Sequence, residues 1–417
     1  MSHNTGSNTR QRLQRMKNSG LISNGNQLKT EKRGQLSQLF PGEEWEEVYP
    51  EGSCYYRETS INLKHKHGCM VLEYARECTG NSLQLLMANS SEDSSEMVNP
   101  CQGLFLDLET TGLAGGTGTW AFLVGAGWIE ENQLRVRQYF LRHPREERFL
   151  LQHFVNSFRE YHTLISFNGK TFDLPLFHTR QVIHGVTPFM SPSMHVDLLY
   201  CSRRFWKDRL PSCSLQSLEE NVLLYRREGD IPGEEIPGVY FQYLRQGETS
   251  RLKKVFEHNR LDIITMVALL GTISKLEKKD FLDTACPEDC YALGLLLWKK
   301  GYYSRAEKCL RKAAEKGSRR QRCQAYKKLG FLYKHLKDWE ASVSCWKLLL
   351  EDNSYDLEAY VELAKIYEHR LKNLAKALQI TREAISLASR YYQMGGARRE
   401  LTELRHRLNR IERKSSS

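Results

Sequence analysis

Acidic residues recur in three short stretches of the chain at spacings that suit the binding of divalent cations. In the first stretch, Asp107 and Glu109 lie two residues apart within the apolar run Phe105–Leu113, which predicts a buried strand. Side chains alternate along a strand, so the two carboxylates emerge on the same face. Paired carboxylates repel one another unless a cation lies between them, and a hard divalent cation with oxygen ligands is the natural candidate.

The second stretch places Asp173 shortly after Asn168-Gly169, a turn signal that follows an apolar run. Asp173 could bind a metal ion, or it could cap the structure after the turn. Asn168 and Lys170 could contact a phosphate group of a substrate. A turn-forming asparagine and a solvated lysine explain these two residues equally well.

The third stretch, Glu257–Ile263, predicts a helix on which His258 and Asp262 are four residues apart and share one face. If the strand, the turn and the helix pack together, four carboxylates and one imidazole converge. Such a set can hold two metal ions about 3.5–4 Å apart, which clamp the attacking and leaving oxygens of an in-line displacement. His258 would then accept the proton of the attacking water. Each pair alone is common in proteins, and the prediction rests on their order, spacing and apolar framing together.

In this order, the three stretches resemble the motifs of the DEDD superfamily of 3′→5′ exonucleases, which have an RNase H-like fold. The likeness covers residues 100–275 and extends to a bacterial subgroup of uncharacterised RNase H-like proteins with C-terminal tetratricopeptide repeats. Three further segments support it: Gly115–Gly125, Gln138–Leu141 and Asp230–Gly233.

The resemblance implies two metal ions, Mg²⁺ or Mn²⁺, and assigns His258 as the general base. It also implies four metal ligands: Asp107, Glu109, Asp173 and Asp262. One spacing departs from the pattern. Three residues separate His258 from Asp262, as in the tyrosine type of the superfamily, whereas the histidine type has four. Asp197, at the end of another apolar run, could assist in the site or have a structural role at a strand end.

The composition limits the class of protein. A chain of 417 residues with 40% hydrophobic and 27% charged residues predicts two or three globular domains. The sequence contains neither a run of about 20 apolar residues nor a signal peptide, so we expect a cytoplasmic protein that has no membrane partner. Eleven cysteines without a framework spacing are expected to be free thiols.

Charge is distributed unevenly along the chain. Residues 1–34 have a net charge of +6, and residues 285–417 carry 28 basic and 16 acidic side chains. The middle segment, which contains the acidic stretches, has a net charge of −7. The basic flanks could attract the phosphates of a nucleic acid. Ordinary solvated helix faces would give the same composition.

Four regions are expected along the chain. Residues 1–40 predict a disordered basic arm, 41–100 a β-rich extension, 101–284 an α/β RNase H-like domain, and 285–417 a helical repeat domain. The α/β domain should be a mixed sheet with flanking helices. Within the first 300 residues, the expected strands lie near 54–57, 68–74, 103–109, 119–129, 134–141 and 163–167, and a helix lies near 146–160.

The last region repeats with the period of tetratricopeptide motifs. Leu293, Leu329 and Leu363 are 36 and 34 residues apart, and each is followed by a small residue. We therefore expect about three helix pairs and a basic final helix over 397–414. Repeats of this kind stack into a concave surface that usually binds a protein or peptide.

Two function classes remain open at this point. The preferred interpretation is a two-metal 3′→5′ exonuclease acting on single-stranded DNA or RNA. The alternative is a scaffold or adaptor that acts through its repeats and carries a vestigial nuclease fold. A nuclease for small nucleotides is a third possibility, for which the basic flanks would be irrelevant.

Overall fold

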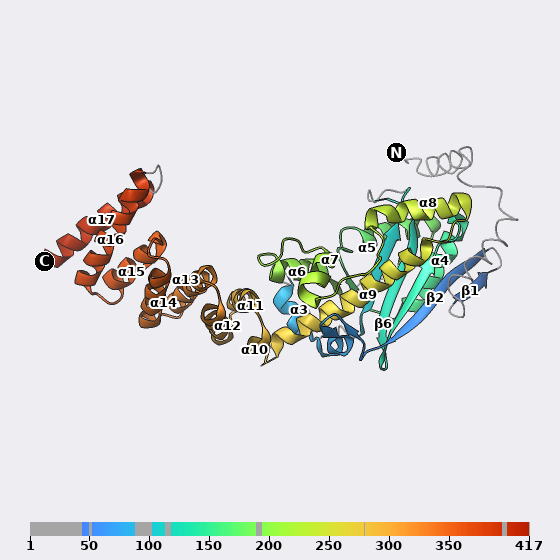
Figure 1. Cartoon of the computed structure of the whole chain (residues 1–417), viewed down its shortest axis with the longest axis horizontal. Helices are drawn as coiled ribbons and strands as arrows, with labels where there is room; N and C mark the ends of the chain where they lie inside the picture. Colours follow the sequence, from blue (N-terminus) through green and yellow to red (C-terminus); the bar gives the residue numbers. More distant parts are fainter. Residues whose placement is uncertain are drawn as a thin grey trace. The chain divides into compact units, whose positions relative to one another are not determined.

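The structure is a computed structural model, and it describes residues 44–49, 52–87, 102–112, 118–188, 194–278, 280–393 and 398–416. The chain forms two compact units that divide between residues 278 and 279, a few residues before the boundary expected from the sequence (Figure 1). The expected disordered arm, over residues 1–40, lies outside the described residues, as does most of the glycine-rich loop at 115–118.

The first unit contains a seven-stranded mixed sheet in the order β1-β2-β7-β6-β5-β8-β9. Neighbouring strands are antiparallel from β1 to β5, and β8 and β9 continue the sheet in parallel with β5. Its strands are β1 (Glu44–Tyr49), β2 (Gly52–Asn62), β5 (Leu104–Thr110), β6 (Ala121–Glu130), β7 (Gln133–Phe140), β8 (Thr163–Ser166) and β9 (Met194–Asp197). The strands predicted near 103–109, 119–129, 134–141 and 163–167 are confirmed.

Helices cover both faces of this sheet. The side chains of β7 alternate between the faces: Tyr139 contacts the ring of Phe158 in α4, whereas Phe140 contacts Tyr243 in α8 and Phe256 in α9. Figure 1 shows α9 running diagonally across the strands. The principal helices of the unit are α4 (Glu147–Phe158), α5 (Asp173–His184), α6 (Leu198–Trp206), α8 (Ile236–Gln246) and α9 (Leu252–Ser274).

The residues before the acidic strand belong to this unit as well. Strand β2 pairs with β7 over Tyr56–Asn62, so the extension continues the main sheet. The prediction of a strand over residues 68–74 is wrong in extent. Gly68 takes a left-handed conformation (φ +60°), which limits the hairpin to the two-residue strands β3 (Lys66–His67) and β4 (Met70–Val71). The short elements that remain are η1 (Leu72–Glu77), α3 (Gly80–Leu86), η3 (Pro144–Glu146), α7 (Leu215–Leu218), η4 (Glu219–Leu223), η5 (Gly233–Glu235) and η6 (Lys275–Glu277).

Two glycines of β6 let α9 lie directly on the sheet. A Cβ atom at Gly125 would lie 2.4 Å from Asn259 Oδ1, and one at Gly127 would lie 2.4 Å from Ile263 Cγ2. Real Cβ atoms do not approach neighbours this closely, so a larger residue at either position would force Asn259 or Ile263 to shift. The glycines thereby allow side chains of α9 to reach the carboxylates of the adjacent strand β5.

The described part of the second unit is helical, and from residue 287 on each helix packs on the next. Left-handed residues recur at Gly301, Lys337 and Lys372, 36 and 35 residues apart, each between the two helices of a pair. Three pairs and a final helix are present, and their assignment to the tetratricopeptide type stays a prediction. The helices are α10 (Phe281–Thr284), α11 (Pro287–Lys299), α12 (Tyr303–Lys316), α13 (Arg319–His335), α14 (Trp339–Asp352), α15 (Leu357–His369), α16 (Leu374–Gln393) and α17 (Arg398–Ser416).

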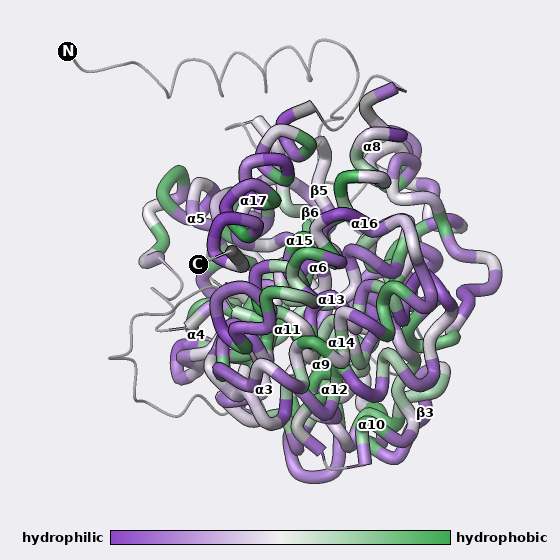
Figure 2. Tube along the Cα trace, turned by 90° about the vertical axis from the view of Figure 1, so that its left-hand side faces the viewer, coloured by the Kyte–Doolittle hydropathy of each residue, from purple (hydrophilic) through white to green (hydrophobic). Residues whose placement is uncertain are grey.

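The final helix is held by charge as well as by apolar contacts. Helix α17 appears largely hydrophilic in Figure 2. Its side chains Arg407, Arg410 and Lys414 all bind the buried carboxylate of Glu368 in α15. Although burial opposes it, hydrogen bonding to Arg410 and Lys414 lowers the pKa of Glu368 to about 2. The expected basic helix therefore attaches to the repeats through an ion-pair cluster.

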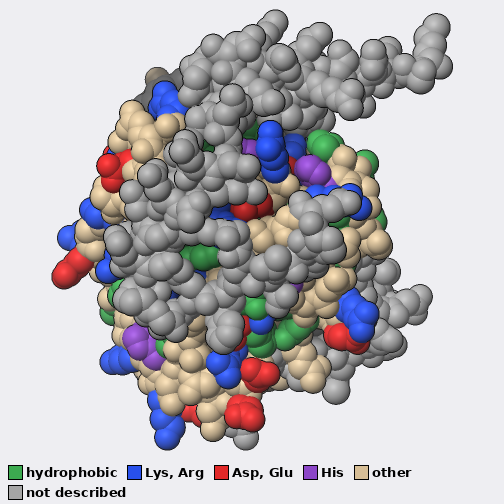
Figure 3. Space-filling model, turned by 90° about the vertical axis from the view of Figure 1, so that its right-hand side faces the viewer, with side chains coloured by type: hydrophobic (Ala, Val, Ile, Leu, Met, Phe, Trp, Pro, Cys, Tyr) green, Lys and Arg blue, Asp and Glu red, His purple; other side chains and the backbone are tan. Residues whose placement is uncertain are grey.

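The surface and the thiols agree with the class expected from composition. On the face drawn in Figure 3, acidic and basic side chains are interspersed. Within the described residues, no helix has the length and apolar composition to cross a membrane. The ten cysteines of the described part form no disulfide with one another, which agrees with the expectation of thiols.

We predict that Gly127→Val destabilises the protein by about 1–3 kcal/mol, because the new side chain overpacks the contact between β6 and Ile263. Gly238→Ala is the matched control, since its Cβ would meet no atom within 4 Å on helix α8. Alanine there should stabilise slightly. Chemical denaturation compares the two, and equal effects would contradict the close approach of α9 to the sheet.

Candidate metal centre

The acidic strand and the long helix bring three of the predicted residues into one group. Ligand atoms of Glu109, His258 and Asp262 all lie within 4.8 Å of one another. Glu109 extends from β5, whereas His258 and Asp262 come from one face of α9. The i, i+4 spacing seen in the sequence thus points both helix residues at the same strand.

The other two predicted carboxylates lie beside this group. Asp107 is on the same face of β5 as Glu109, and the negative charges of Asp262, Glu109 and Asp173 act on it. Asp173 is the first residue of α5 and is buried. The fold therefore brings all four carboxylates into electrostatic contact.

The proximity of these carboxylates makes their ionisation unfavourable. Burial and then the neighbouring acids raise the pKa of Asp107 well above its usual range. Burial, partly offset by His258, raises the pKa of Glu109 to about 8. Burial and the charges of Asp197 and Asp262 raise the pKa of Asp173 to about 7. Oxygen donors crowded in this way, with one imidazole beside them, fit a hard divalent cation, which would relieve the repulsion.

Asp197 has the structural role that the sequence left open. Its carboxylate accepts hydrogen bonds from the backbone N–H groups of Asn168 (2.9 Å), Lys170 (3.1 Å) and Leu199 (3.0 Å). One buried carboxylate thus fixes the turn after β8 and caps helix α6. Asp173 follows this turn, so the position of Asp173 depends on the turn.

The conformation of this turn accounts for the presence of Asn168 and Gly169. Asn168 is left-handed (φ +65°), and its side-chain oxygen accepts a hydrogen bond from Thr171 Oγ1 at 3.0 Å. A Cβ at Gly169 would lie 2.4 Å from Ser166 Oγ and 3.3 Å from Asp173 Oδ2. The side chain of Lys170 is exposed. Substrate contacts by Asn168 and Lys170 stay predictions.

Arg227 is a central residue of the site that sequence reasoning missed. Its side chain is 7% exposed, and its guanidinium binds Asp262, Glu219 (2.7 Å) and Asp230 (3.2 Å). These contacts raise the pKa of Arg227 despite its burial. No local signal distinguishes it from Arg226, its neighbour in the sequence, whose side chain is 84% exposed.

His258 lies between two carboxylates. Its Nδ1 is 2.9 Å from both carboxylate oxygens of Asp230, and its Nε2 is 3.7 Å from Asp262 Oδ2. Although burial lowers it, the charges of Asp262 and Glu109 and the contact with Asp230 raise the pKa of His258. In the sequence, Asp230 belongs only to a segment that supports the resemblance. Its pairing with His258 could not be predicted because the two residues are 28 positions apart.

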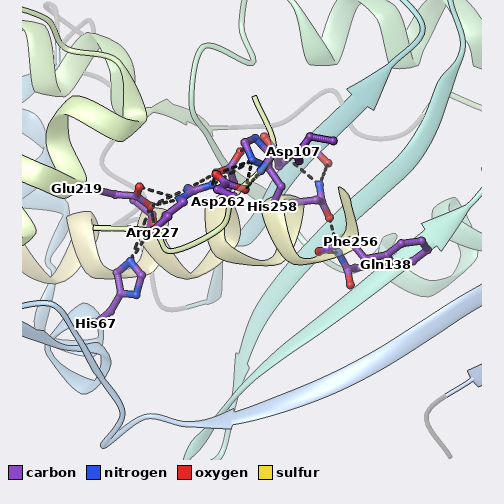
Figure 4. A network of polar contacts seen from close by, with 12 residues as sticks. His67, Asp107, Gln138, Glu219, Arg227, Phe256, His258 and Asp262 are labelled. Carbon is purple, nitrogen blue, oxygen red and sulfur yellow. Dashed lines mark hydrogen bonds and ion pairs between the residues drawn. The ribbon is translucent and has the colours of Figure 1, made fainter. Parts of the chain in front are cut away.

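The side-chain amides of Asn259 and Gln138 form a row that fixes the carboxylate of Asp107. Asp107, Gly125 and Gln138 lie opposite one another on three adjacent strands. Asn259 of α9 crosses this row and donates to Asp107 Oδ2 at 2.8 Å, while Gln138 donates to Asn259 Oδ1 at 2.9 Å and to the carbonyl of Phe256 at 2.7 Å (Figure 4). The missing side chain of Gly125 leaves the space for Asn259.

The N-terminal extension reaches the same network from the other end. Buried Glu219 accepts hydrogen bonds from Arg227 and Thr265, and Thr265 Oγ1 lies 3.0 Å from Nε2 of buried His67. In Figure 4 the chain of contacts runs along α9 from His67 to Gln138. Segments that are far apart in the sequence therefore hold one site.

We predict that Arg227→Gln destabilises the protein by about 3–5 kcal/mol, because it leaves the buried Glu219 without its cation. Arg226→Gln is the control, and its effect should stay within about 0.5 kcal/mol because the side chain is exposed. The measurement is urea denaturation of the two variants beside the wild type. Similar losses in both would contradict the role of Arg227 as an internal counter-ion.

The raised pKa values predict that the metal-free protein loses stability as pH rises. Glu109 and Asp173 bind protons more tightly in the folded chain, so the stability present below their usual pKa values is lost as pH rises through about 7 and 8. In EDTA, the Tm should fall between about pH 4 and about pH 8 and level off above that range. Mn²⁺ should oppose this fall, since a ligand of the folded state stabilises it.

The matched variants of this pH series are Glu109→Gln and Glu160→Gln. The first removes a crowded carboxylate and should flatten the pH dependence. The second removes a carboxylate whose side chain is 83% exposed and should leave it unchanged. An unaltered slope in Glu109→Gln would show that the repulsion is not at this site.

Comparison with known proteins relates the chain to an established superfamily. Residues 104–274, from the first residue of β5 to the last of α9, match the RNase H superfamily. The chain is 31% identical over 420 residues to the uncharacterized protein YprB of Bacillus subtilis (strain 168), and the alignment covers 97% of this chain and 99% of that protein. The chain therefore belongs to the same family as YprB and contains an RNase H superfamily domain.

Proposed function

We propose that this protein is a metal-dependent nuclease, specifically a 3′→5′ exonuclease that hydrolyses single-stranded DNA or RNA. The observation that supports the proposal best is the convergence of four carboxylates and one histidine on an RNase H-like sheet. Nucleases of this fold usually use divalent metals. The alternative of a vestigial fold gives no reason for so many acids to share one site at such an electrostatic cost.

The residues that would hold Mg²⁺ or Mn²⁺ are Asp107, Glu109, Asp173 and Asp262, with two ions as the proposed stoichiometry. When bound, the ions would polarise the scissile phosphate and acidify the attacking water. His258 would accept the proton of that water at Nε2, the nitrogen that faces the group. Neutralisation of the surrounding carboxylates would lower the pKa of His258 and favour its unprotonated form.

The basic regions and the repeats supply the proposed contacts beyond the site. The acidic middle segment repels a polyanion, whereas the net charge of residues 285–417 is +12 and favours it. The helical repeats would bind a protein partner or hold the nucleic acid. A scaffold function through these repeats is the second candidate, and it is favoured by three successive helix pairs that form a compact unit of their own.

We predict that purified protein shortens 5′-labelled single-stranded DNA or RNA from the 3′ end in Mn²⁺ or Mg²⁺, and not in EDTA. Asp107→Ala should remain folded, because it relieves charge repulsion, and should lose this activity. Arg226→Gln is the control and should degrade the substrate at the wild-type rate. Gel analysis of the labelled products follows the reaction.

Different outcomes separate the candidates. Retained activity in Asp107→Ala would contradict the metal site proposed here. Binding of nucleic acid or of a partner without cleavage would favour the scaffold. Cleavage of small nucleotides alone, with a rate that varies little with salt, would assign a nuclease that does not use the basic flanks.

A further inference from the structure

His258 has two nitrogens in different surroundings, and this difference sets what the ring can do. Nδ1 faces Asp230, 2.9 Å from both carboxylate oxygens. Nε2 faces the acidic group, 3.7 Å from Asp262 Oδ2. A neutral imidazole carries a hydrogen on one nitrogen and a lone pair on the other. The neighbours of the ring therefore decide which nitrogen can accept a proton.

Asp230 selects the tautomer. Hydrogen bonding and charge from His258 and Arg227 lower the pKa of Asp230 despite its partial burial, so its carboxylate is ionised and can only accept. Arg227 Nη1, which can only donate, lies farther from Nδ1, at 3.4 Å, than the two Asp230 oxygens at 2.9 Å. The shorter contacts therefore assign the hydrogen to Nδ1, which leaves the lone pair of the neutral ring at Nε2. This arrangement directs the basic nitrogen toward Glu109 and Asp262.

Asp230 is itself held in place by two groups. Its Oδ1 accepts a hydrogen bond from the backbone N–H of Ile231 at 2.8 Å, and Ile231 is buried in the apolar core. Its Oδ2 lies 3.2 Å from Arg227 Nη1, and the same guanidinium binds Asp262. The carboxylates on the two sides of the His258 ring are thus joined through one rigid cation.

We propose that Asp230 is a positioning residue for His258, fixing the Nδ1–H tautomer so that Nε2 faces the metal-binding carboxylates. The consequence for catalysis rests on the proposed nuclease function, in which His258 is the general base. The tautomer does not depend on that function. The two parts are therefore tested by separate measurements.

The tautomer is measured directly by ¹⁵N NMR of histidine-labelled, metal-free full-length protein at a pH that deprotonates the ring. The His258 signals are identified by their loss in His258→Gln. The wild type should show the Nδ1–H tautomer, and Asp230→Ala should lose this preference. Glu228→Gln, which changes an exposed acid of the same loop, should match the wild type. An Nε2–H tautomer in the wild type, or an unchanged tautomer in Asp230→Ala, would overturn the proposal.

The catalytic part is tested by a double-mutant cycle of Asp230→Asn and His258→Ala. If Asp230 acts through His258, Asp230→Asn lowers kcat by roughly 10²-fold in the wild type and has no further effect in His258→Ala. Mn²⁺ affinity, followed by calorimetry, should be unchanged by Asp230→Asn. Equal losses in both backgrounds would assign Asp230 a merely structural role and overturn its action through His258.

The two proposals fail in distinguishable ways. A wild-type protein without any metal-dependent cleavage would refute the nuclease, and the NMR result would still decide the tautomer. Full activity in His258→Ala would show that His258 is not the general base. Asp230 could then have no effect on catalysis through His258.

Discussion

Mutual repulsion among carboxylates is the constraint on which the rest of the site depends. Four buried or partly buried acids on one strand and two helices lie close together. Burial first, and then the neighbouring acids, raise the pKa values of Asp107, Glu109 and Asp173. A fold tolerates such a concentration of charge only if its surroundings hold the acids in place and offer positive charge. Arg227 supplies the charge, and the amide row of Asn259 and Gln138 fixes the orientation.

The support for the site comes from backbone geometry as much as from side chains. Glycines in β6 leave space for the side chains of Asn259 and Ile263, so that α9 can pack closely on the sheet. Asp197 holds the turn that leads into α5 through three backbone N–H groups. Each acid therefore arises from an element whose position is determined independently of any bound ion.

Local patterns in the sequence were sufficient to predict the mixed sheet and the helix that carries His258 and Asp262. Apolar runs mark strands, and an i, i+4 pair marks a helix face, because both signals depend on neighbours in the sequence. Arg227 could not be predicted in this way. Its difference from Arg226 lies in contacts with residues 8 and 35 positions away, which only the folded chain brings together. The same reason hid the pairing of Asp230 with His258 and the joining of β2 to the main sheet.

The pairing of β2 with β7 has a consequence for what counts as the domain. The superfamily match begins at β5, yet a chain cut there would expose the hydrogen-bonding edge of β7 and remove His67 from the polar network. Exposed strand edges pair readily with other chains and favour aggregation. The segment that matches the superfamily is therefore shorter than the sheet to which it belongs. The residues that precede the matched segment complete the sheet of the first unit and its polar network.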